Sequence, residues 1–387
     1  MSGNVFVLGA GRTGLASARD LLNSKDVTHV TVGDINTSRA ENFAKKTGSD
    51  KISITRIDLT NHENLVNAIK HAAVVINATW YEYNVDVMKA AIEAGIHYID
   101  MGGLFHVTRK QMELDESAKS AGVTAVLGAG ESPGITNVTC AYSGKEMDSV
   151  ETIKIRVGAR DISTSPEAKL LFPFAVSTIF DEYSKPPVMF LNGKFEQVEP
   201  LSGQEEVPFP NPVGNQPCHY SIHSEIATLP LSFKGVNHVD FKLGISEHIY
   251  QALKPLVEAG MASAEPIDVK GRKVSPRDFA IALLTARAGD AEPPRYVALR
   301  TELTGLRNGR RVMQVCDIIG EPSESMGIRN ATALLTGTGA SITAQLILRN
   351  QIVQRGTVAP ESCIPTSIYM KELDNRKIRM TVQEKEL

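Results

Sequence analysis

Three glycines near the N-terminus, and the acid that follows them, have the clearest chemical use in this chain. Gly9, Gly11 and Gly14 form the pattern GxGxxG directly after the apolar segment Asn4–Leu8, and Asp34 lies 20 residues beyond Gly14. In this arrangement the first glycine permits a tight turn, the second lets the backbone approach a pyrophosphate, and the third lets helix and strand pack closely. The helix that follows offers unpaired N–H groups to the phosphates. The pattern predicts a dinucleotide site, with a glycine-rich turn in an unrelated α/β unit as the alternative.

The acid also bears on which dinucleotide binds. A carboxylate at this strand end accepts hydrogen bonds from the adenosine ribose hydroxyls and repels a 2′-phosphate. Asp34 therefore favours NAD over NADP, although Arg39, five residues further on, could soften that preference. Arg12 lies in the glycine loop itself, where it either contacts the adenine or a phosphate or is simply solvated.

The first 127 residues or so alternate regularly between segments typical of strands and of helices. Six short apolar segments joined by helical patterns predict a parallel doubly wound Rossmann sheet. These segments are Asn4–Leu8, His29–Asp34, Ile52–Asp58, Val74–Ala78, His97–Met101 and Val123–Leu127. Ligands bind such sheets at the carboxyl ends of the strands. The residues expected to contact the cofactor are therefore Gly9, Gly11, Arg12, Thr13, Gly14, Asp34, Asp58, Leu59, Asn77, Ala78 and Thr79.

The pattern changes after Leu127, where strand-like segments begin to dominate. Asn192–Gly193 and Asn308–Gly309 are hairpin signals between such segments, so we expect a second α+β domain with a mixed or antiparallel sheet. The cofactor domain is predicted to span residues 1–130 and the second domain residues 131–329. Thr336–Gly339 is predicted to open an apolar helix, from Ala340 to about Leu348, within a segment of about residues 330–360 that returns to the first domain.

Two such domains imply a cleft between them, and three side chains are candidates for acid–base work in it. Hydride transfer needs no side-chain nucleophile, because a nicotinamide carries that chemistry, but an amine or alcohol that loses a proton needs a base. The candidates are Glu131, Asp100 and His223. Each has a purely structural alternative: Glu131 could favour a helix start through its charge, Asp100 could cap a helix, and His223 could lie on the polar face of a strand.

Substrate contacts are expected from Tyr81, Arg156 and Arg160. Tyr81 lies in an aromatic cluster just after the fourth predicted strand, and the two arginines could bind a carboxylate bidentately, although exposed arginines are common. His223 also alternates with His219 and Glu225 along a possible strand. That spacing could bind a metal, but no fourth ligand is evident, so we predict no metal site.

Composition narrows the class of protein. The chain of 387 residues has a formal net charge of −3, which offers no basic footprint for nucleic acid and no polybasic patch for a membrane surface. No apolar run approaches the ~20 residues needed to span a bilayer. A strand that begins at residue 4 leaves no room for a signal peptide. The four cysteines form no CxxC pair and are expected to be reduced, mostly buried thiols, so we expect a cytoplasmic protein.

Longer stretches resemble the saccharopine dehydrogenase-like family, and most closely its lysine 6-dehydrogenase branch. The similar stretches are Val74–Thr79, Ala90–Gly103, Ser132–Asn137, Phe172–Tyr183 with Asn192–Lys194, and Thr336–Gly339 with Gly356–Glu361. The resemblance implies a Rossmann domain, a mixed-sheet domain for substrate binding and dimerisation, and a homodimer or higher homo-oligomer. It also implies NAD(P)-linked chemistry at a carbon–nitrogen bond of a small amino-acid substrate.

One position departs from the family pattern. Saccharopine-forming reductases of this family carry an acid immediately before a Pro-Gly pair, whereas here that position is Ser132 and Glu131 precedes it. A small residue there favours oxidative deamination of the ε-amine of L-lysine, which yields the semialdehyde and then piperideine-6-carboxylate. The alternatives are a dehydrogenase of the saccharopine or carboxynorspermidine type, which joins an amine to a carbonyl compound, and an inactive NAD-binding sensor or scaffold.

Overall fold

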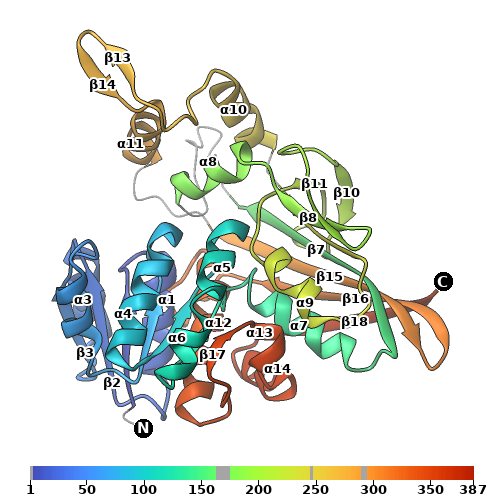
Figure 1. The fold of residues 1–387 in the computed structure, drawn as a ribbon, viewed down its shortest axis with the longest axis horizontal. Helices are drawn as coiled ribbons and strands as arrows, with labels where there is room; N and C mark the ends of the chain where they lie inside the picture. Colours follow the sequence, from blue (N-terminus) through green and yellow to red (C-terminus); the bar gives the residue numbers. More distant parts are fainter. Residues whose placement is uncertain (1–2, 163–174, 245–246, 289–293) are drawn as a thin grey trace.

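A computed structural model describes residues 3–162, 175–244, 247–288 and 294–387. Its N-terminal part is a parallel sheet flanked by helices (Figure 1). Within the described residues this sheet has seven strands: β1 (Asn4–Leu8), β2 (His29–Asp34), β3 (Ile52–Arg56), β4 (Val74–Asn77), β5 (His97–Asp100), β6 (Thr124–Val126) and β17 (Gly356–Val358). Their order is β17-β6-β5-β4-β1-β2-β3, which is the doubly wound order of a Rossmann sheet with β17 added beside β6.

The six predicted strands are present, and the seventh was missed. β17 is only three residues long, too short for an alternating pattern to reveal it. The helices of this domain are α1 (Arg12–Leu22), α2 (Ser38–Thr47), α3 (His62–Ile69), α4 (Asn84–Ala94), α5 (Phe105–Met112) and α6 (Asp115–Ser120). The chain turns after Met112, and Leu114 packs against the apolar core between α5 and α6.

The second domain is built on a mixed sheet with the order β10-β11-β12-β7-β15-β16-β18; β8 also pairs with β12, and β9 pairs with β8. The strands are β7 (Ser149–Asp161), β8 (Val188–Leu191), β9 (Lys194–Gln197), β10 (Glu205–Pro208), β11 (Asn215–Tyr220), β12 (His238–Gly244), β15 (Arg295–Arg307), β16 (Arg310–Gly320) and β18 (Met380–Glu386). Both predicted hairpin turns are present, with positive φ at Asn192, Gly193, Asn308 and Gly309. Helix α7 (Ile135–Gly144) packs on this sheet.

A third group of helices covers one end of the second sheet. We call it the cap: α8 (Val176–Ser184), α10 (Glu247–Glu258), α11 (Pro276–Ala288) and the hairpin β13 (Ile267–Val269) and β14 (Arg272–Val274), which projects from the body (Figure 1). The cap has its own apolar core, which includes Phe180, Tyr183 and Leu253. Phe172–Phe174, part of a stretch that resembles the family, lie outside the described residues.

Helix α12 (Ala331–Leu348) packs along α1. Gly337 makes the approach possible, because a Cβ there would lie 2.6 Å from the Ala16 Cβ, and Ser17 Oγ donates to the Gly337 carbonyl at 2.9 Å. The helix therefore begins nine residues before the predicted start at Ala340, since the glycines serve helix packing and not a loop. It is long and apolar enough to cross a membrane by length and composition, but 83% of it is buried inside the protein.

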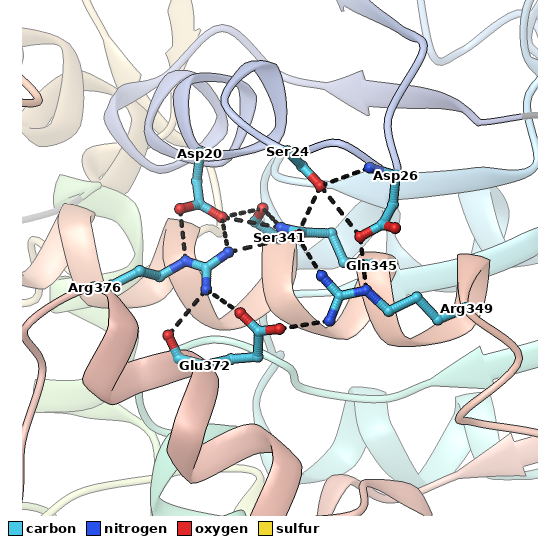
Figure 2. Close-up of polar contacts among 8 residues, drawn as sticks. All are labelled: Asp20, Ser24, Asp26, Ser341, Gln345, Arg349, Glu372 and Arg376. Atoms are coloured by element: carbon cyan, nitrogen blue, oxygen red, sulfur yellow. Dashed lines mark hydrogen bonds and ion pairs between the residues drawn. The ribbon is translucent and has the colours of Figure 1, made fainter.

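A polar cluster locks this helix to its neighbours (Figure 2). Arg376, on α14 (Thr366–Asn375) at its C-terminal end, donates to both carboxylate oxygens of Asp20 on α1, at 2.7 and 2.9 Å. Ser341 of α12 donates to the same carboxylate at 2.6 Å. Arg349 pairs with Asp26 at 2.6 Å. The cluster ties α12 and α14 to the first helix of the Rossmann domain.

The four cysteines are buried and free, as expected of reduced thiols. Among the residues that the structure describes, no three His, Cys, Asp or Glu side chains are grouped so that they could hold a metal ion.

Candidate functional site

One cavity of about 1040 Å³ joins the carboxyl edge of the Rossmann sheet to the second domain and the cap. Its first end is lined by the glycine loop and by the ends of β2, β3 and β4. Its other end is lined by β7, β12, β15 and α12, with α8 and α11 of the cap over it. Such a cavity between domains is the usual place for a cofactor to meet a substrate.

Ten of the eleven residues predicted to contact the cofactor line this cavity: Gly9, Gly11, Arg12, Thr13, Asp34, Asp58, Leu59, Asn77, Ala78 and Thr79. Gly14 lies behind the loop, where an added Cβ would overlap the Gly9 carbonyl oxygen. A Cβ on Gly11 would meet no atom within 4 Å, because it would occupy the cavity itself. This open cradle over the start of α1 fits a pyrophosphate.

The acid at the end of β2 is held in place by backbone. Asp34 Oδ2 accepts from the Ala10 N–H at 2.6 Å and Oδ1 accepts from the Asn36 N–H at 2.9 Å. The carboxylate keeps further lone pairs at the cavity wall, which suit ribose hydroxyls. At the end of β4, Asn77 Oδ1 accepts from the Thr79 hydroxyl at 2.6 Å and shapes the turn that passes the nicotinamide half of the site.

His223 forms a polar pair with a buried carboxylate, Glu225, in the second domain. Its Nδ1 bonds to Glu225, a carboxylate with no exposed surface, and the Ser132 hydroxyl donates to that same carboxylate. The imidazole stacks on Phe241, with ring centroids 3.9 Å apart. Burial disfavours the imidazolium, but the charge and hydrogen bond of Glu225 outweigh it, so the pKa of His223 is raised above 6.5. A carboxylate behind Nδ1 leaves Nε2 for a ligand in the cavity.

The prediction that His219, His223 and Glu225 alternate along one strand is wrong. β11 ends at Tyr220, and the chain turns into a short 3₁₀ helix, η2 (Glu225–Ala227). His219 therefore does not share a face with His223; it stacks on Tyr250, with ring centroids 5.6 Å apart.

Glu131 lines the cavity beside Ser132, in the loop between β6 and α7. Its side chain is buried, and Oε2 has no hydrogen-bond partner. Burial raises the pKa of Glu131 to about 8, against the opposing effects of Arg295 and the Thr332 hydroxyl. The alternative that the charge of Glu131 favours a helix start does not apply directly, because α7 starts four residues later with Gly134 as its N-cap.

Two further charged residues of the cavity were missed from the sequence. Glu182 on α8 is buried, its Oε2 lacks a partner, and burial raises its pKa to about 8. Arg295, at the start of β15, donates from Nη1 to both oxygens of Asp161 at 2.7 Å, while its Nε has no partner. The one available signal for Glu182 was the acidic pair Asp181–Glu182 within a helix that has no other charged residue. A single arginine before a strand gave no signal for Arg295.

Asp100, a predicted acid–base candidate, lies away from the cavity, and its oxygens accept hydrogen bonds inside the fold. It accepts from the backbone N–H groups of Gly102 and Gly128, both at 2.8 Å, and from Gln111 Nε2 at 2.7 Å. Burial raises its pKa, and the residue does not line the cavity. Asp100 therefore stabilises the loops that follow β5 and β6 by joining them through hydrogen bonds.

The two arginines predicted to bind substrate lie on the wrong face of β7. Successive residues of a strand point to opposite faces, and Val157 and Ala159 line the cavity, so Arg156 and Arg160 point away. Arg156 is 1% exposed and pairs with Asp240 and Glu205. Arg160 is exposed and donates to a loop carbonyl at 3.1 Å.

Tyr81 does line the cavity, from η1 (Tyr81–Tyr83) after β4. Its hydroxyl, however, donates to Asp181 of α8 at 2.5 Å and accepts from Lys185 at 3.1 Å. Arg277 of α11 donates to the same aspartate at 2.9 Å. These bonds fasten the cap to the Rossmann domain, and the tyrosine ring is what remains for a ligand.

Comparison with known proteins gives two matching family models. The saccharopine dehydrogenase NADP binding domain matches residues 5–126, and the saccharopine dehydrogenase C-terminal domain matches residues 130–378. Carboxyaminopropylagmatine dehydrogenase of Synechocystis sp. is 23% identical over 74% of each chain. Carboxynorspermidine synthase of Vibrio alginolyticus is 23% identical over 79% of this chain and 78% of the relative.

Solved structures show the same fold. Saccharopine dehydrogenase (L-Glu forming) of Saccharomyces cerevisiae superimposes with a TM-score of 0.74 at 18% identity, and 99% of each chain is covered. Homospermidine synthase of Legionella pneumophila, solved in complex with NAD, superimposes with a TM-score of 0.70 at 11% identity, over 98% of this chain and 91% of that one.

Proposed function

Because this chain belongs to the saccharopine dehydrogenase family, we propose that it is an NAD-dependent enzyme that joins an amine to a carbonyl compound by reduction. The observation that carries this proposal is one continuous cavity, which runs from the glycine loop to His223 and to two buried acids, Glu131 and Glu182, each with one carboxyl oxygen that has no hydrogen-bond partner. Glu131 and Glu182 bring two acidic groups to the cavity wall, and an ammonium bound beside either one would favour the ionised form that burial disfavours. A substrate with more than one nitrogen fits this arrangement, and the named relatives act on substrates of that kind.

NAD is the cofactor we propose. Gly11 leaves room for the pyrophosphate, and the Asp34 carboxylate faces the place of the adenosine ribose. The matching model is named for NADP binding, but a 2′-phosphate beside this carboxylate would meet like charge. When bound, the reduced nicotinamide would supply the hydride.

His223 would serve as the proton donor of this reaction. Condensation of an amine with a ketone or aldehyde expels water, and reduction of the resulting C=N bond completes the product: R₂C=O + R′NH₂ + NADH + H⁺ → R₂CH–NHR′ + NAD⁺ + H₂O. The carbonyl oxygen must gain protons as it leaves. An imidazolium held by Glu225 can donate from Nε2 and recover its proton from solvent, in the manner of a general acid.

Oxidative deamination of L-lysine is the second candidate, and Ser132 before Pro133 is the observation that favours it. This reaction runs in the oxidative direction with the same groups, and His223 would act as the base that takes a proton from the amine. An inactive sensor with the same fold is the candidate from another class.

Three assays separate these functions. Oxidation of NADH that requires both an amine and a carbonyl compound supports the proposal. Reduction of NAD by L-lysine alone supports deamination. Tight NADH binding with no turnover in either direction, over a panel of amines and oxo acids, supports the sensor.

A further inference from the structure

The end of the cavity beneath the cap is lined by uncharged side chains. Among the described residues that line the cavity, none from β7, β12, α10 or α11 carries a charge. The charged residues of this half come instead from α8, from β15 and from the segments just before α7 and η2. A charged group against an apolar wall loses its water without gaining a partner, so this wall indicates a ligand group that is itself apolar.

The sheet of the second domain forms the floor of this end. Val157 and Ala159 face the cavity from β7. The strand register places Leu243 of β12 directly beside Val157. It also places Val297 of β15 directly beside Ala159. Because neighbouring strands lie about 4.8 Å apart, these four side chains form one continuous apolar surface.

The helices of the cap form the roof. The roof residues are Val176 and Ile179 of α8, Ile249 of α10 and Ile281 of α11, all of which line the cavity. They belong to the apolar core of the cap or pack against it, and Leu243 of the floor packs against the same core. The floor and the roof therefore meet at Leu243. We call the space between this floor and this roof the cap pocket.

The cap pocket begins beside the acid–base pair. Phe241 lies on the same face of β12 as Leu243, and its ring stacks on that of His223 with centroids 3.9 Å apart. A carbonyl compound that receives a proton from His223 would therefore have the apolar floor next to it. The amine of the proposed reaction binds against Glu131 and Glu182, which leaves the uncharged pocket to the other substrate.

We propose that the cap pocket binds an aliphatic group of the carbonyl substrate, which is an aldehyde or a 2-oxo acid with a hydrocarbon side chain. The inference rests on the proposed function and names the class of one of its two substrates. The pocket removes the hydrocarbon surface from water, so the affinity grows with each methylene. A carboxylate or an ammonium at the same place would be desolvated without an opposite charge among the residues of the pocket.

Homologous series of ligands measure the pocket without turnover. The probes are the straight-chain 2-oxo acids from pyruvate to 2-oxoheptanoate, the straight-chain aldehydes from propanal to heptanal, and the n-alkylamines of the same lengths. Binding is measured by calorimetry on the protein saturated with NAD, because the oxidised cofactor cannot reduce a carbonyl group. The affinity should rise about threefold to fourfold for each added methylene in at least one of the two carbonyl series.

Each carbonyl series also has a matched pair of ligands with equal shape. 5-Methyl-2-oxohexanoate is compared with 2-oxoglutarate, and 4-methylpentanal with succinate semialdehyde. In the series that responds to length, the apolar member should bind more than about tenfold more tightly, because the second member places a carboxylate in the pocket.

Two variants change the pocket from opposite sides. Ala159→Leu fills part of the floor and should weaken the longest ligands about tenfold without changing the three-carbon ones, since about two methylenes lose their place. Ile281→Thr makes the roof smaller and more polar and should weaken the longest ligands about threefold or more. Leu283→Thr, on the same helix but with a side chain that is 45% exposed, is the matched control and should change no affinity. Unchanged NADH binding by fluorescence titration shows that a variant keeps its fold.

The proposal is overturned if neither carbonyl series gains affinity with length, if the charged member of each matched pair binds as tightly as the apolar one, or if both variants keep the full gain. A gain with length in the alkylamines alone would also overturn it. Its failure is distinct from that of the proposed function. Selective binding of apolar carbonyl compounds without turnover of any amine and carbonyl pair would overturn the function and leave the pocket standing. Coupling of amines only to short or charged carbonyl compounds would do the opposite.

Discussion

Replacement of the buried carboxylate behind His223 gives the sharpest test of the acid–base assignment. Glu225→Gln keeps the shape of the side chain and removes its charge. The carboxylate is 0% exposed and the histidine side chain 14% exposed, so solvent does little to screen the pair. In the wild type the pKa of His223 is raised above 6.5, and the variant should lower it.

The size of the change follows from the bond that is lost. A hydrogen bond between charged groups contributes about 1.5–3 kcal/mol, and 1.36 kcal/mol corresponds to one pKa unit, so the pKa should fall by about one to two units. Burial, which disfavours the imidazolium, then acts without its main counterweight. The limb of the pH–rate profile that reports this group should move to lower pH by the same amount.

Histidine NMR measures this pKa without reference to turnover. The His223 resonance is identified by its loss in His223→Gln, and the protein is titrated with and without Glu225→Gln. Glu199→Gln, an exposed acid of the same domain, should leave the titration unchanged. A His223 pKa that stays constant or rises in Glu225→Gln would refute the assignment of Glu225 as the group that holds the proton on this ring.

Three further predictions concern the cofactor and the fold. Gly11→Val should leave the melting temperature within a few degrees but weaken NADH binding more than tenfold by fluorescence titration, whereas Gly14→Ala should lower the melting temperature because its Cβ overlaps the Gly9 carbonyl. Asp34→Asn should reduce the ratio of NADH to NADPH affinity by about tenfold, since it removes the like charge that opposes a 2′-phosphate; an unchanged ratio would remove the basis for NAD. Arg376→Met leaves the buried Asp20 carboxylate without its guanidinium and should cost about 3 kcal/mol in urea unfolding, while Arg310→Met, whose side chain is 72% exposed, should cost under about 1 kcal/mol. Equal losses for both arginines would contradict a structural role for the cluster in Figure 2.

The cofactor end of the site could be predicted from the sequence because its signals are local. The glycine spacing and the acid at the second strand end are properties of one continuous βαβ unit, and the parallel sheet follows from regular alternation. β17 and the true start of α12 could not be predicted, because both depend on packing partners that are distant in the sequence. The strand pairs with β6, and Gly337 packs against α1.

The substrate end could be predicted only in part, because the use of a charged side chain depends on its neighbours in space. Asp100 follows the same rule as Asp34, at the end of a parallel strand, yet two backbone N–H groups and an amide consume its oxygens. Arg156 and Arg295 both lie on strands of one sheet, but their side chains point to opposite faces of it. Arg156 therefore pairs with buried acids, whereas Arg295 lines the cavity. Sequence resemblance identified the family correctly, and it favoured lysine deamination, whereas the named relatives and the two buried acids of the cavity, Glu131 and Glu182, favour the coupling of an amine to a carbonyl compound.

The proposed reaction is tested most directly by its need for two substrates. The protein is incubated with NADH, an amine panel and an oxo-acid and semialdehyde panel, singly and in pairs, and the products are identified by mass spectrometry. The predicted result is consumption of NADH only when both partners are present, with a product whose mass equals amine plus carbonyl compound, less water, plus two hydrogens. NADH consumption by a carbonyl compound alone, or reduction of NAD by L-lysine with no coupled product from any pair, would contradict it.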